Sequence, residues 1–355
     1  MNPVSVASRV GILIPTYNRR EYLAKALRSA IEQTCTDLEI IVIDNGSTDG
    51  TDSMMAEMGD QRVRYVVNEQ NLGIVGSINK GVRLFSPDVV WVTILPDDDI
   101  LGQHYIASML ARQVGAQVKN VLHGAPVIID SQGQKLRSVA PVPEIESSFA
   151  YLLSRTGKNR ESFLTGVFFS RKAFEGIGGY PVFTTGMATD DAFIFALAAG
   201  DRLVFNPEAT VYVRVHDEAE SQQVVGIIKH IRALQDFKKY ILEITYSCAF
   251  SENIMPTLER TLDHYVSKLA SGLWIRNVKV LFKSQPADLS AQLEALLNVV
   301  AGNRGIAFSP RVRLSTFIAI KTGYWPESSI WYRAPWEIVR KISGEISGER
   351  RLFSH

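Results

Sequence analysis

Short apolar runs alternate with amphipathic segments over the first hundred residues of the chain. Four of the runs are expected to form β-strands: Val10–Ile14, Glu39–Ile43, Arg62–Asn68 and Val89–Leu95. The first, second and fourth are almost continuously apolar, which predicts strands buried on both faces. Between the runs, apolar residues recur at helical spacing over Tyr22–Ile31 and Ile74–Phe85. Asn18 and Glu21 have the capping-box spacing and predict where the first of these helices begins.

This alternation predicts an α/β domain with a mostly parallel central sheet and helices on both of its faces. Ligands of such sheets bind at the carboxyl ends of the strands. Polar segments follow three of the predicted strands at that position, namely Pro15–Arg19, Asp44–Ser47 and Asp97–Asp99. We therefore expect three segments that are distant in the sequence to form one site at this edge of the sheet.

The pattern changes along the rest of the chain. Further strands are expected at Asn120–Asp130, Phe163–Ser170 and Arg202–His216, and beyond about residue 225 the apolar residues follow helical spacing. We predict two domains. The first covers residues 1–225, with halves at about 1–100 and 101–225, and the second is a helical C-terminal region over residues 226–355.

The charge balance differs between the two predicted domains, although the net charge of the 355 residues is only +1. Residues 229–355 carry 18 Lys and Arg against 11 Asp and Glu, whereas residues 1–228 carry 20 against 26. A basic helical region is either a solvated face or a surface for an anionic partner, such as a phosphate-bearing acceptor or a membrane. The apolar fraction of 46% is enough for a packed core.

The cysteines and the N-terminus bear on the compartment. The two cysteines, Cys35 and Cys248, form neither a CxxC motif nor a cluster with metal-ligand spacing, so we expect no disulfide framework and no zinc site. The N-terminus lacks a signal-peptide pattern, and the sequence has no run of about 18 apolar residues. We therefore predict a cytoplasmic protein without a spanning helix.

Three successive aspartates, Asp97, Asp98 and Asp99, follow an apolar strand. Crowded carboxylates raise one another's pKa unless a cation compensates them. The segment PTYNRR after the first strand is not the glycine-rich loop of a dinucleotide-binding or P-loop domain, and the spacing of the acids does not fit an EF-hand. Mg²⁺ or Mn²⁺ joining the aspartates to the phosphates of a nucleotide fits the residue types. A turn of solvated aspartates is the alternative.

Six motifs occur in an order that resembles the inverting glycosyltransferases of family 2, which have the GT-A fold, and among them bacterial enzymes of cell-surface polysaccharide synthesis. The resemblance covers roughly residues 8–220. The motifs are Ile14–Arg19, Glu39–Thr51, Asn71–Gly81, Ile94–Asp99, Leu164–Tyr180 and Thr189–His216. The resemblance implies that the first domain is a GT-A catalytic domain with a donor half followed by an acceptor half.

The resemblance further implies a donor site for a UDP- or dTDP-sugar. The loop after the first strand is expected to meet the nucleoside, and Asp44 is expected to read the pyrimidine, whose N3–H a carboxylate can accept. Many family members have a second Asp at the position of Asn45. The residues that the resemblance assigns to the nucleotide sugar are Pro15, Thr16, Tyr17, Arg19, Asp44, Asn45, Ser47, Asn79, Asp97 and Asp98.

A divalent cation, Mn²⁺ or Mg²⁺, is implied at the DxD-like segment, in which Pro96 replaces the first acid. Asp98 is expected to be the direct ligand, with Asp99 and Asp97 in support. His216 resembles a position where related enzymes keep a further metal or phosphate contact, although a lone histidine is more often structural. The implied metal ligands are Asp98, Asp99 and His216.

Asp190 and Asp191 match the acidic pair of the family, with Asp191 at the position of the catalytic base. Inversion is a single displacement in which the acceptor hydroxyl loses a proton as it attacks, and a carboxylate base typically accelerates such a step by about 10²- to 10⁴-fold. A pair that only interacts with a helix dipole is the alternative. The acceptor is expected at Thr165, Gly166, Gly179 and Tyr180, where the glycines are equally typical of an ordinary turn.

We predict that the protein moves a sugar to a hydroxyl of a glycan or a lipid-linked glycan, the alternative being a catalytically silent nucleotide-sugar-binding or scaffold subunit. Aromatic and basic residues of the C-terminal region suit peripheral contact with the inner face of the cell membrane. Packing onto the catalytic domain or a homo-oligomer contact explains them as well and is slightly favoured. These residues are Trp274, Trp325, Trp331, Trp336, Arg333, Arg340, Lys341, Arg350 and Arg351. We expect no nucleic-acid partner.

Overall fold

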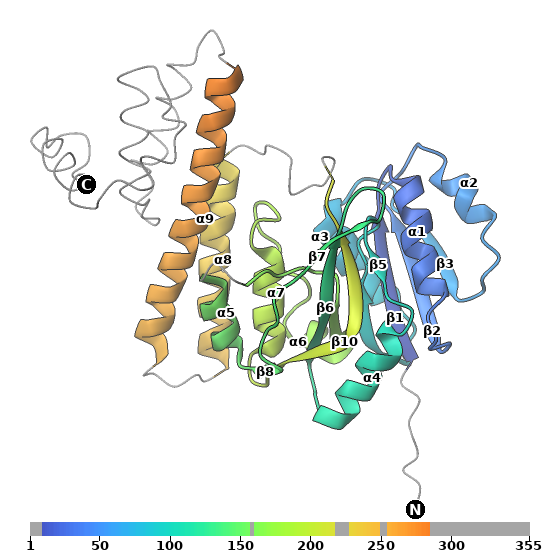
Figure 1. Ribbon diagram of the computed structural model, residues 1–355, viewed down its shortest axis with the longest axis horizontal. Helices are drawn as coiled ribbons and strands as arrows, with labels where there is room; N and C mark the ends of the chain where they lie inside the picture. The colour runs from blue at the N-terminus through green and yellow to red at the C-terminus, as the bar shows by residue number, and fades with distance from the viewer. Residues whose placement is uncertain (1–8, 157–159, 217–226, 249–253, 285–355) are drawn as a thin grey trace, which may run out of the picture. The chain divides into compact units, whose positions relative to one another are not determined.

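The computed structural model describes residues 9–156, 160–216, 227–248 and 254–284 of the chain (Figure 1). The chain divides into two compact units. Met1–Gln223 and Tyr240–Phe250 form the first unit, and Val224–Lys239 and Ser251–His355 form the second. All the residues predicted for the donor, metal, base and acceptor sites belong to the first unit.

A ten-stranded mixed sheet forms the centre of the first unit (Figure 1). Eight strands follow the order β3-β2-β1-β4-β9-β6-β10-β5, while β7 pairs with β6 and β8 pairs with β10. The strands are β1 Arg9–Thr16, β2 Leu38–Asp44, β3 Val63–Val67, β4 Val89–Ile94, β5 Ile100–Leu101, β6 Val121–Ile129, β7 Lys135–Ser138, β8 Ile145–Glu146, β9 Val167–Ser170 and β10 Leu203–Arg214.

The two halves of this sheet differ in strand direction. Strands β3, β2, β1 and β4 are mutually parallel, as the alternation of strands and helices predicted. Strand β9 then lies antiparallel between β4 and β6, and β6 pairs in parallel with β10. The predicted α/β class is confirmed, and the antiparallel neighbours lie in the second half of the sheet.

Helices cover both faces of the sheet, and successive residues of the central strands alternate between two cores. Val10, Ile12 and Ile14 of β1 pack in the core that contains α1, α2 and α4, whereas Leu13 packs in the core that contains α3, α5, α6 and α7. This alternation is the side-chain period of a strand and explains the continuous apolar runs. The helices are α1 Arg20–Ile31, α2 Thr51–Ala56, α3 Gly73–Leu84, α4 Tyr105–Ala116, α5 Ser148–Thr156, α6 Arg171–Gly176 and α7 Thr189–Ala198.

The predicted capping box at the start of α1 is wrong. Arg19 is the N-cap residue and makes no side-chain cap. Asn18 has a φ of 52°, and its Oδ1 accepts a hydrogen bond of 2.7 Å from the backbone N–H of Thr48. The asparagine therefore joins the loop after β1 to the loop after β2, because its short side chain tolerates the left-handed backbone and reaches a neighbouring amide.

The predicted strand Phe163–Ser170 is shorter in the structure, where β9 begins at Val167. The preceding residues form a turn in which the N–H of Val167 donates to the carbonyl of Leu164, and Gly166 has a φ of 93°. A φ in this region favours glycine. The turn directs Thr165 toward the ends of the parallel strands.

Two long helices make up the described part of the second unit. The C-terminal end of the first of these helices, from Tyr240 onward, is counted with the first unit. Helix α8 spans Ile227–Ser247 and helix α9 spans Met255–Ser284, which agrees with the predicted helical pattern. Phe237 and Tyr265 are buried with ring centroids 5.3 Å apart. Within the described ranges, no helix combines the length and the apolar character that a membrane span requires.

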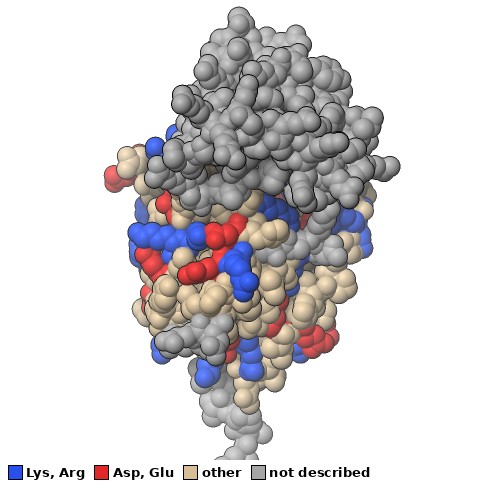
Figure 2. Space-filling model, turned by 90° about the vertical axis from the view of Figure 1, so that its left-hand side faces the viewer, with Lys and Arg blue, Asp and Glu red and all other residues tan. Residues whose placement is uncertain are grey.

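The distribution of charged side chains on one face of the molecule is mixed. On the face shown in Figure 2, basic and acidic side chains of the described residues lie next to one another. The predicted membrane contact concerned mainly the C-terminal tail, whose residues Trp325, Trp331, Trp336 and Arg333–Arg351 lie outside the described residues. The predicted domain boundary at residues 225 and 226 stays a prediction.

Candidate active site

The loops after β1, β2 and β4 meet at the carboxyl ends of these strands. Thr16 pairs in register with Asp44, and the N–H of Asn45 donates to the carbonyl of Thr16. The hydroxyl of Thr16 donates a hydrogen bond of 2.8 Å to Asp97 Oδ2. The structure therefore brings together the three polar segments that the sequence predicted to form one site.

Asp97 is buried beneath this edge. Besides the Thr16 bond, its Oδ1 accepts a hydrogen bond of 3.3 Å from a guanidinium nitrogen of Arg19. Burial, followed by the neighbouring Asp98 charge, raises the pKa of Asp97 to about 6, while Arg19 acts in the opposite direction. Arg19 therefore offsets only part of the cost of ionising this carboxyl.

Asp99 is held from the second half of the domain. The backbone N–H of Arg214 donates to Asp99 Oδ1 at 2.7 Å, and the hydroxyl of Thr165 donates to Asp99 Oδ2. Burial and the adjacent Asp98 raise the pKa of Asp99 to about 8. With both oxygens bonded and only 5% of the residue exposed, Asp99 is a support for the cluster rather than its accessible carboxylate.

Asp98 is the most accessible of the three carboxylates, with 15% of its side chain exposed. Its Oδ2 accepts a hydrogen bond of 2.8 Å from Arg19 and lies 3.1 Å from Nε2 of His216. Nδ1 of His216 is buried and has no hydrogen-bond partner among the described residues. Arg214 fixes the backbone here, because its Nε donates to the carbonyl of Asp98.

The oxygen and nitrogen atoms of this cluster are of the kinds that could bind Mn²⁺ or Mg²⁺. Such ions are bound in nucleotide sites by one or two carboxylates, with phosphate oxygens and water completing the shell. Asp98 supplies one accessible carboxylate, an oxygen ligand that suits both Mn²⁺ and Mg²⁺, and His216 supplies an imidazole beside it. No group of three or more His, Cys, Asp or Glu side chains within the described ranges has the geometry of a complete metal site. The residues thus fit a cation that substrate phosphates help to hold.

Asp44 was predicted to contact a pyrimidine, but in the structure its side chain is almost completely enclosed by the protein. Its Oδ1 accepts hydrogen bonds from the N–H and the hydroxyl of Ser47, and its Oδ2 accepts one of 2.5 Å from the hydroxyl of Tyr65. Only 1% of Asp44 is exposed. The Asp44 contact stays a prediction, and in this structure Asp44 shapes the loop from within.

Asn45 and Asn79, both predicted to bind the nucleotide sugar, bind other parts of the protein. Asn45 Oδ1 accepts hydrogen bonds from the side chains of Asn68 and Ser77 and from the N–H of Leu72. Asn79 exchanges two hydrogen bonds with the backbone of Tyr180, at 2.8 and 2.9 Å. Both side chains therefore position loops around the site.

The remaining predicted donor residues differ in accessibility. Pro15 is buried within β1, where it pairs in register with Ile43. Tyr17 is 47% exposed, which leaves its ring open to a ligand such as a base. Ser47 has its hydroxyl on Asp44 and accepts the N–H of Asn18 at 2.8 Å.

Asp191, the predicted base, is buried at the start of α7 and bound to an arginine. Nε and one terminal nitrogen of Arg155 donate to its two oxygens at 2.7 and 3.0 Å. The hydroxyl of Tyr151 donates to Asp191 Oδ1 at 2.6 Å. Asp190 is only half-buried and accepts a hydrogen bond from the hydroxyl of Tyr180. Asp191 is thus the fixed member of the acidic pair, and Asp190 is the more accessible one.

A short series of contacts joins the two acidic groups. Tyr151, which binds Asp191, also shares a hydrogen bond of 2.6 Å with the hydroxyl of Ser162. Three residues further along the chain, Thr165 binds Asp99. One loop therefore reaches both the predicted base and the predicted metal cluster.

The residues predicted for the acceptor lie in tightly packed backbone. Thr165 is 3% exposed, and a side chain at Gly166 would meet Val211. Gly179 has a φ of 100°, and a Cβ there would lie 2.4 Å from Asn79 Oδ1. These glycines are required by turns and close approaches, which was the alternative explanation, and their contact with an acceptor stays a prediction.

Sequence reasoning missed the roles of four residues that organise the site, which are Tyr65, Tyr151, Arg155 and Arg214. Arg214 holds Asp98 and Asp99 in place through hydrogen bonds to the backbone of the first and the carboxylate of the second. Their partners lie 21, 40, 36 and at least 115 positions away in the chain. No local pattern signals such pairs. Arg214 lies inside the last of the six motifs, which is the only sequence signal that drew attention to it.

Comparison with known proteins adds the family context. The profile described as glycosyl transferase family 2 matches residues 11–178. An uncharacterized glycosyltransferase of Nostoc sp. is 23% identical over 245 residues, which are 64% of this chain and 75% of that protein. The UDP-Glc:alpha-D-GlcNAc-diphosphoundecaprenol beta-1,3-glucosyltransferase of Escherichia coli is 29% identical over 135 residues, 37% of this chain and 51% of that protein.

Among solved structures, S. aureus TarS in complex with UDP-GlcNAc has a TM-score of 0.58 at 14% identity, with 88% of this chain and 87% of that chain covered. At this identity the likeness shows a shared fold, and it confirms the predicted GT-A architecture. The chain spans about half or less of the length of most curated relatives that it matches.

Proposed function

Because residues 11–178 belong to glycosyltransferase family 2, we propose that this protein is a metal-dependent inverting enzyme that moves a sugar from a UDP- or dTDP-sugar to a hydroxyl of a glycan or lipid-linked glycan. Residues 1–225 are the catalytic domain in this proposal, and residues 226–355 are an appended helical region. The observation that carries the proposal is the charge imbalance at Asp97, Asp98 and Asp99.

The imbalance follows from the contacts of the cluster. Three carboxylates face two guanidiniums, those of Arg19 and Arg214, and one imidazole, that of His216. The side-chain hydrogen bonds of Arg214 go to backbone carbonyls, so Arg19 is the guanidinium that binds the carboxylates directly. Burial raises the pKa values of Asp97 and Asp99, and the adjacent Asp98 charge adds to the rise, so a further positive charge would favour the ionised forms. A divalent cation would supply it, and Asp98 with His216 would hold the cation beside the diphosphate. When bound, such a cation stabilises the negative charge that develops on the leaving nucleoside diphosphate.

Asp191 is the proposed base. The acceptor hydroxyl attacks the anomeric carbon, the bond from that carbon to the diphosphate oxygen breaks, and the hydroxyl proton passes to the carboxylate. The positive charge of Arg155, 2.7 Å from Asp191, favours the ionised form that a base needs. Tyr151 and Arg155 also fix the carboxylate in one orientation. Asp190, bound by Tyr180, is the second acid of the pair and borders the same helix start.

We propose the donor and acceptor classes from the names of similar proteins. S. aureus TarS has been solved with UDP-GlcNAc and with UDP, and the E. coli relative is named for a UDP-Glc donor and a diphosphoundecaprenol-linked acceptor. A UDP-sugar donor and a lipid-linked or polymeric acceptor are therefore our first choices for this chain. An acceptor of that kind would bring the protein to the inner face of the membrane.

A catalytically silent subunit that binds nucleotide sugars is the second candidate. The observation that favours it is the ion pair of Asp191 with Arg155, which occupies both carboxylate oxygens. The two candidates share donor binding and differ only in transfer.

The experiment is a calorimetric titration of UDP and dTDP in the presence of Mn²⁺, Mg²⁺ or chelator, followed by a screen of UDP- and dTDP-sugars. We expect tighter nucleotide binding with metal, and nuclear magnetic resonance of the product should show an inverted anomeric configuration. Binding that does not depend on metal would contradict the role of the aspartate cluster. Metal-dependent binding without hydrolysis or transfer of any sugar would favour the silent subunit.

A further inference from the structure

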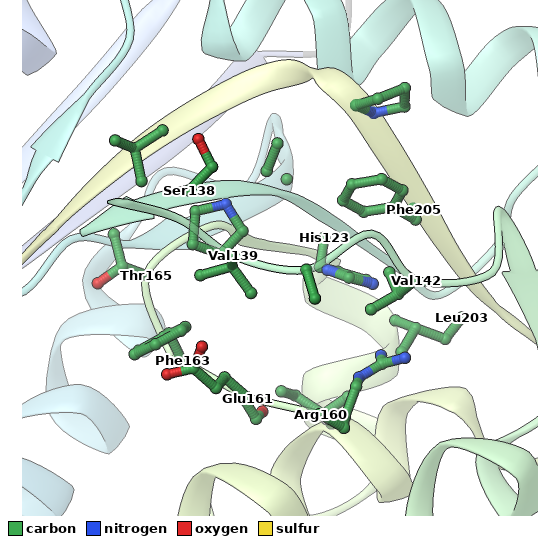
Figure 3. Close-up of a pocket in the computed structure, with 18 of the residues that line it drawn as sticks. His123, Ser138, Val139, Val142, Arg160, Glu161, Phe163, Thr165, Leu203 and Phe205 are labelled. Atoms are coloured by element: carbon green, nitrogen blue, oxygen red, sulfur yellow. The ribbon is translucent and has the colours of Figure 1, made fainter. Parts of the chain in front are cut away.

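A cavity lies between the β6–β7 hairpin and the loop before β9 (Figure 3). Its volume is about 260 Å³. A single water needs only about 10–15 Å³ measured in this way, so the cavity can hold a much larger group. In Figure 3, His123 and Arg160 lie toward the same end of the cavity as Phe205, and Thr165 lies at the opposite end.

His123 offers the cavity an unused polar atom. Nε2 of this residue is buried and has no hydrogen-bond partner among the described residues. Burial, followed by the nearby Arg160 charge, lowers the pKa of His123 to about 3, so the imidazole is neutral at physiological pH. A neutral imidazole carries one donor and one acceptor nitrogen, and a hydroxyl can serve as the partner of either.

Each charged side chain of the wall, Arg160 and Glu161, is paired with an oppositely charged residue outside the wall. Arg160 donates to Glu146 at 2.6 Å, and both side chains are at least 95% buried. Glu161 accepts two hydrogen bonds of 2.7 Å from Arg137. The wall therefore presents no net charge to a ligand, and an ionised ligand would lose its hydration without gaining a counter-charge.

Apolar surface makes up the rest of the wall. Phe163 and Phe205 contribute aromatic rings, and Val139, Val142 and Leu203 contribute aliphatic side chains. Mostly apolar walls with a few placed polar groups are typical of ligand sites in proteins. A sugar ring has this same division, since its C–H faces are apolar and its hydroxyls lie around its edge.

The cavity wall is directly bonded to both acidic groups of the candidate active site. Tyr151 and Thr165 line the cavity, and their hydroxyls donate to Asp191 and Asp99 respectively. The backbone of Arg160 accepts a hydrogen bond from Arg155, the partner of Asp191. A ligand in the cavity would thus lie one side chain away from the proposed base.

We infer that this cavity binds one uncharged sugar residue of the acceptor, with His123 Nε2 bonded to a hydroxyl of that residue and Phe205 against its ring. The identity of the ligand rests on the proposed glycosyl transfer, whereas the cavity and its chemistry do not. His123 and Phe205 are recognition residues in this inference and take no part in bond breaking.

Binding is tested with methyl β-N-acetylglucosaminide as a neutral probe and glucuronate as a charged one, by saturation-transfer magnetic resonance on the full chain. We expect the neutral probe to bind and the charged probe to bind about tenfold more weakly or worse, since tenfold corresponds to about 1.4 kcal/mol. Val139→Trp fills the cavity and should abolish binding of the neutral probe. Val114→Trp adds the same bulk on an exposed part of α4, outside the cavity, and should leave binding unchanged.

His123→Phe is the second variant, which keeps a planar ring but removes the nitrogen. It should weaken the neutral probe by about 2- to 10-fold, the value of one hydrogen bond between neutral groups. In a transfer assay it should raise the acceptor KM by a similar factor and leave the affinity for UDP unchanged.

Three outcomes would overturn the inference: no binding of the neutral probe to the native chain, undiminished binding by Val139→Trp, or an unchanged acceptor KM in His123→Phe. The same experiments distinguish a failure of this inference from a failure of the proposed function. Probe binding that is lost in Val139→Trp, combined with metal-independent UDP binding, supports the cavity and contradicts the proposed function. Metal-dependent transfer that is unchanged in Val139→Trp and His123→Phe supports the proposed function and contradicts the inference about the cavity.

Discussion

Two groups of adjacent aspartates, Asp97–Asp99 and Asp190–Asp191, are stabilised in different ways within the same domain. At the first, one guanidinium is shared between two carboxylates, at 2.8 and 3.3 Å, and a third carboxylate has only neutral donors. At the second, Arg155 binds both oxygens of Asp191 through two hydrogen bonds, and a tyrosine hydroxyl donates a third.

This difference in compensating charge distinguishes two roles that buried carboxylates can have. A carboxylate with its own arginine is neutralised within the protein and held in place, which suits a group that must stay ionised and oriented. In the Asp97–Asp99 cluster, burial and the adjacent acid raise the pKa values of two carboxyls, and such a cluster would be stabilised when a cation binds. Adjacent aspartates therefore predict chemistry only when their compensating charges are known.

The largest effect is expected at the base. Asp191→Asn should lower transfer by about 10²- to 10⁴-fold while leaving UDP binding nearly unchanged. It should also lower the free energy of unfolding by about 3–5 kcal/mol, because the largely buried charge of Arg155 loses the carboxylate that pairs with it. Initial rates, calorimetric UDP binding and thermal denaturation measure the three quantities.

The control for this variant is the double change Asp191→Asn with Arg155→Met, which removes both charges. It should recover much of the lost stability and none of the lost transfer. Full transfer by Asp191→Asn would refute the base, and recovery of transfer in the double variant would mean that misfolding had caused the loss.

A smaller effect is expected for metal linkage at Asp98. Mn²⁺ and UDP together, at about 100 times their dissociation constant, should stabilise the native protein by about 2.7 kcal/mol. Asp98→Asn should remove the part of this stabilisation that depends on Mn²⁺, because Asp98 is the accessible carboxylate of the cluster. Asp88→Asn, at an exposed aspartate paired with Arg9, is the matched control in thermal denaturation. An equal response of both variants would refute the role of Asp98.

The smallest effect concerns pH, in the presence of chelator. The pKa of Asp99 is about 8 in the folded chain and its ordinary value is 3.8, so between these values the native state binds more protons than the unfolded state. Stability should then fall as pH rises from 6 to 8, with a slope of at most about 1.4 kcal/mol per pH unit for this group. Chemical denaturation of the native chain and of Asp99→Asn measures the slope.

Asp99→Asn should reduce this slope, since its amide cannot ionise. The charged neighbours of Asp99 are Asp98 and Arg214, and Thr165 donates to it, so the variant leaves the other groups of the cluster in place. A stability that rises over this pH range in the native chain would show that Asp99 is already ionised and that the contrast between the two acidic regions is wrong.

Much of the fold could be predicted because its signals are local. The continuous apolar runs became β1, β2 and β4, and the helical spacing became α1 and α3. The capping box failed because Asn18 found a partner in the next loop, 30 residues away. The predicted strand before Ser170 was too long because a turn at Gly166 was needed to bring Thr165 to Asp99.

The candidate site was predictable as a list of acids but not as an arrangement. By itself, the sequence determined the order of strands and helices and the edge of the sheet where polar segments gather, because the side-chain period and strand-end loops are encoded within short windows. Only the tertiary structure decided that Arg155 belongs to Asp191, that Arg19 is shared between Asp97 and Asp98, and that His123 faces a cavity. These pairings join distant segments, and burial and charge act on distances in space that no local pattern specifies.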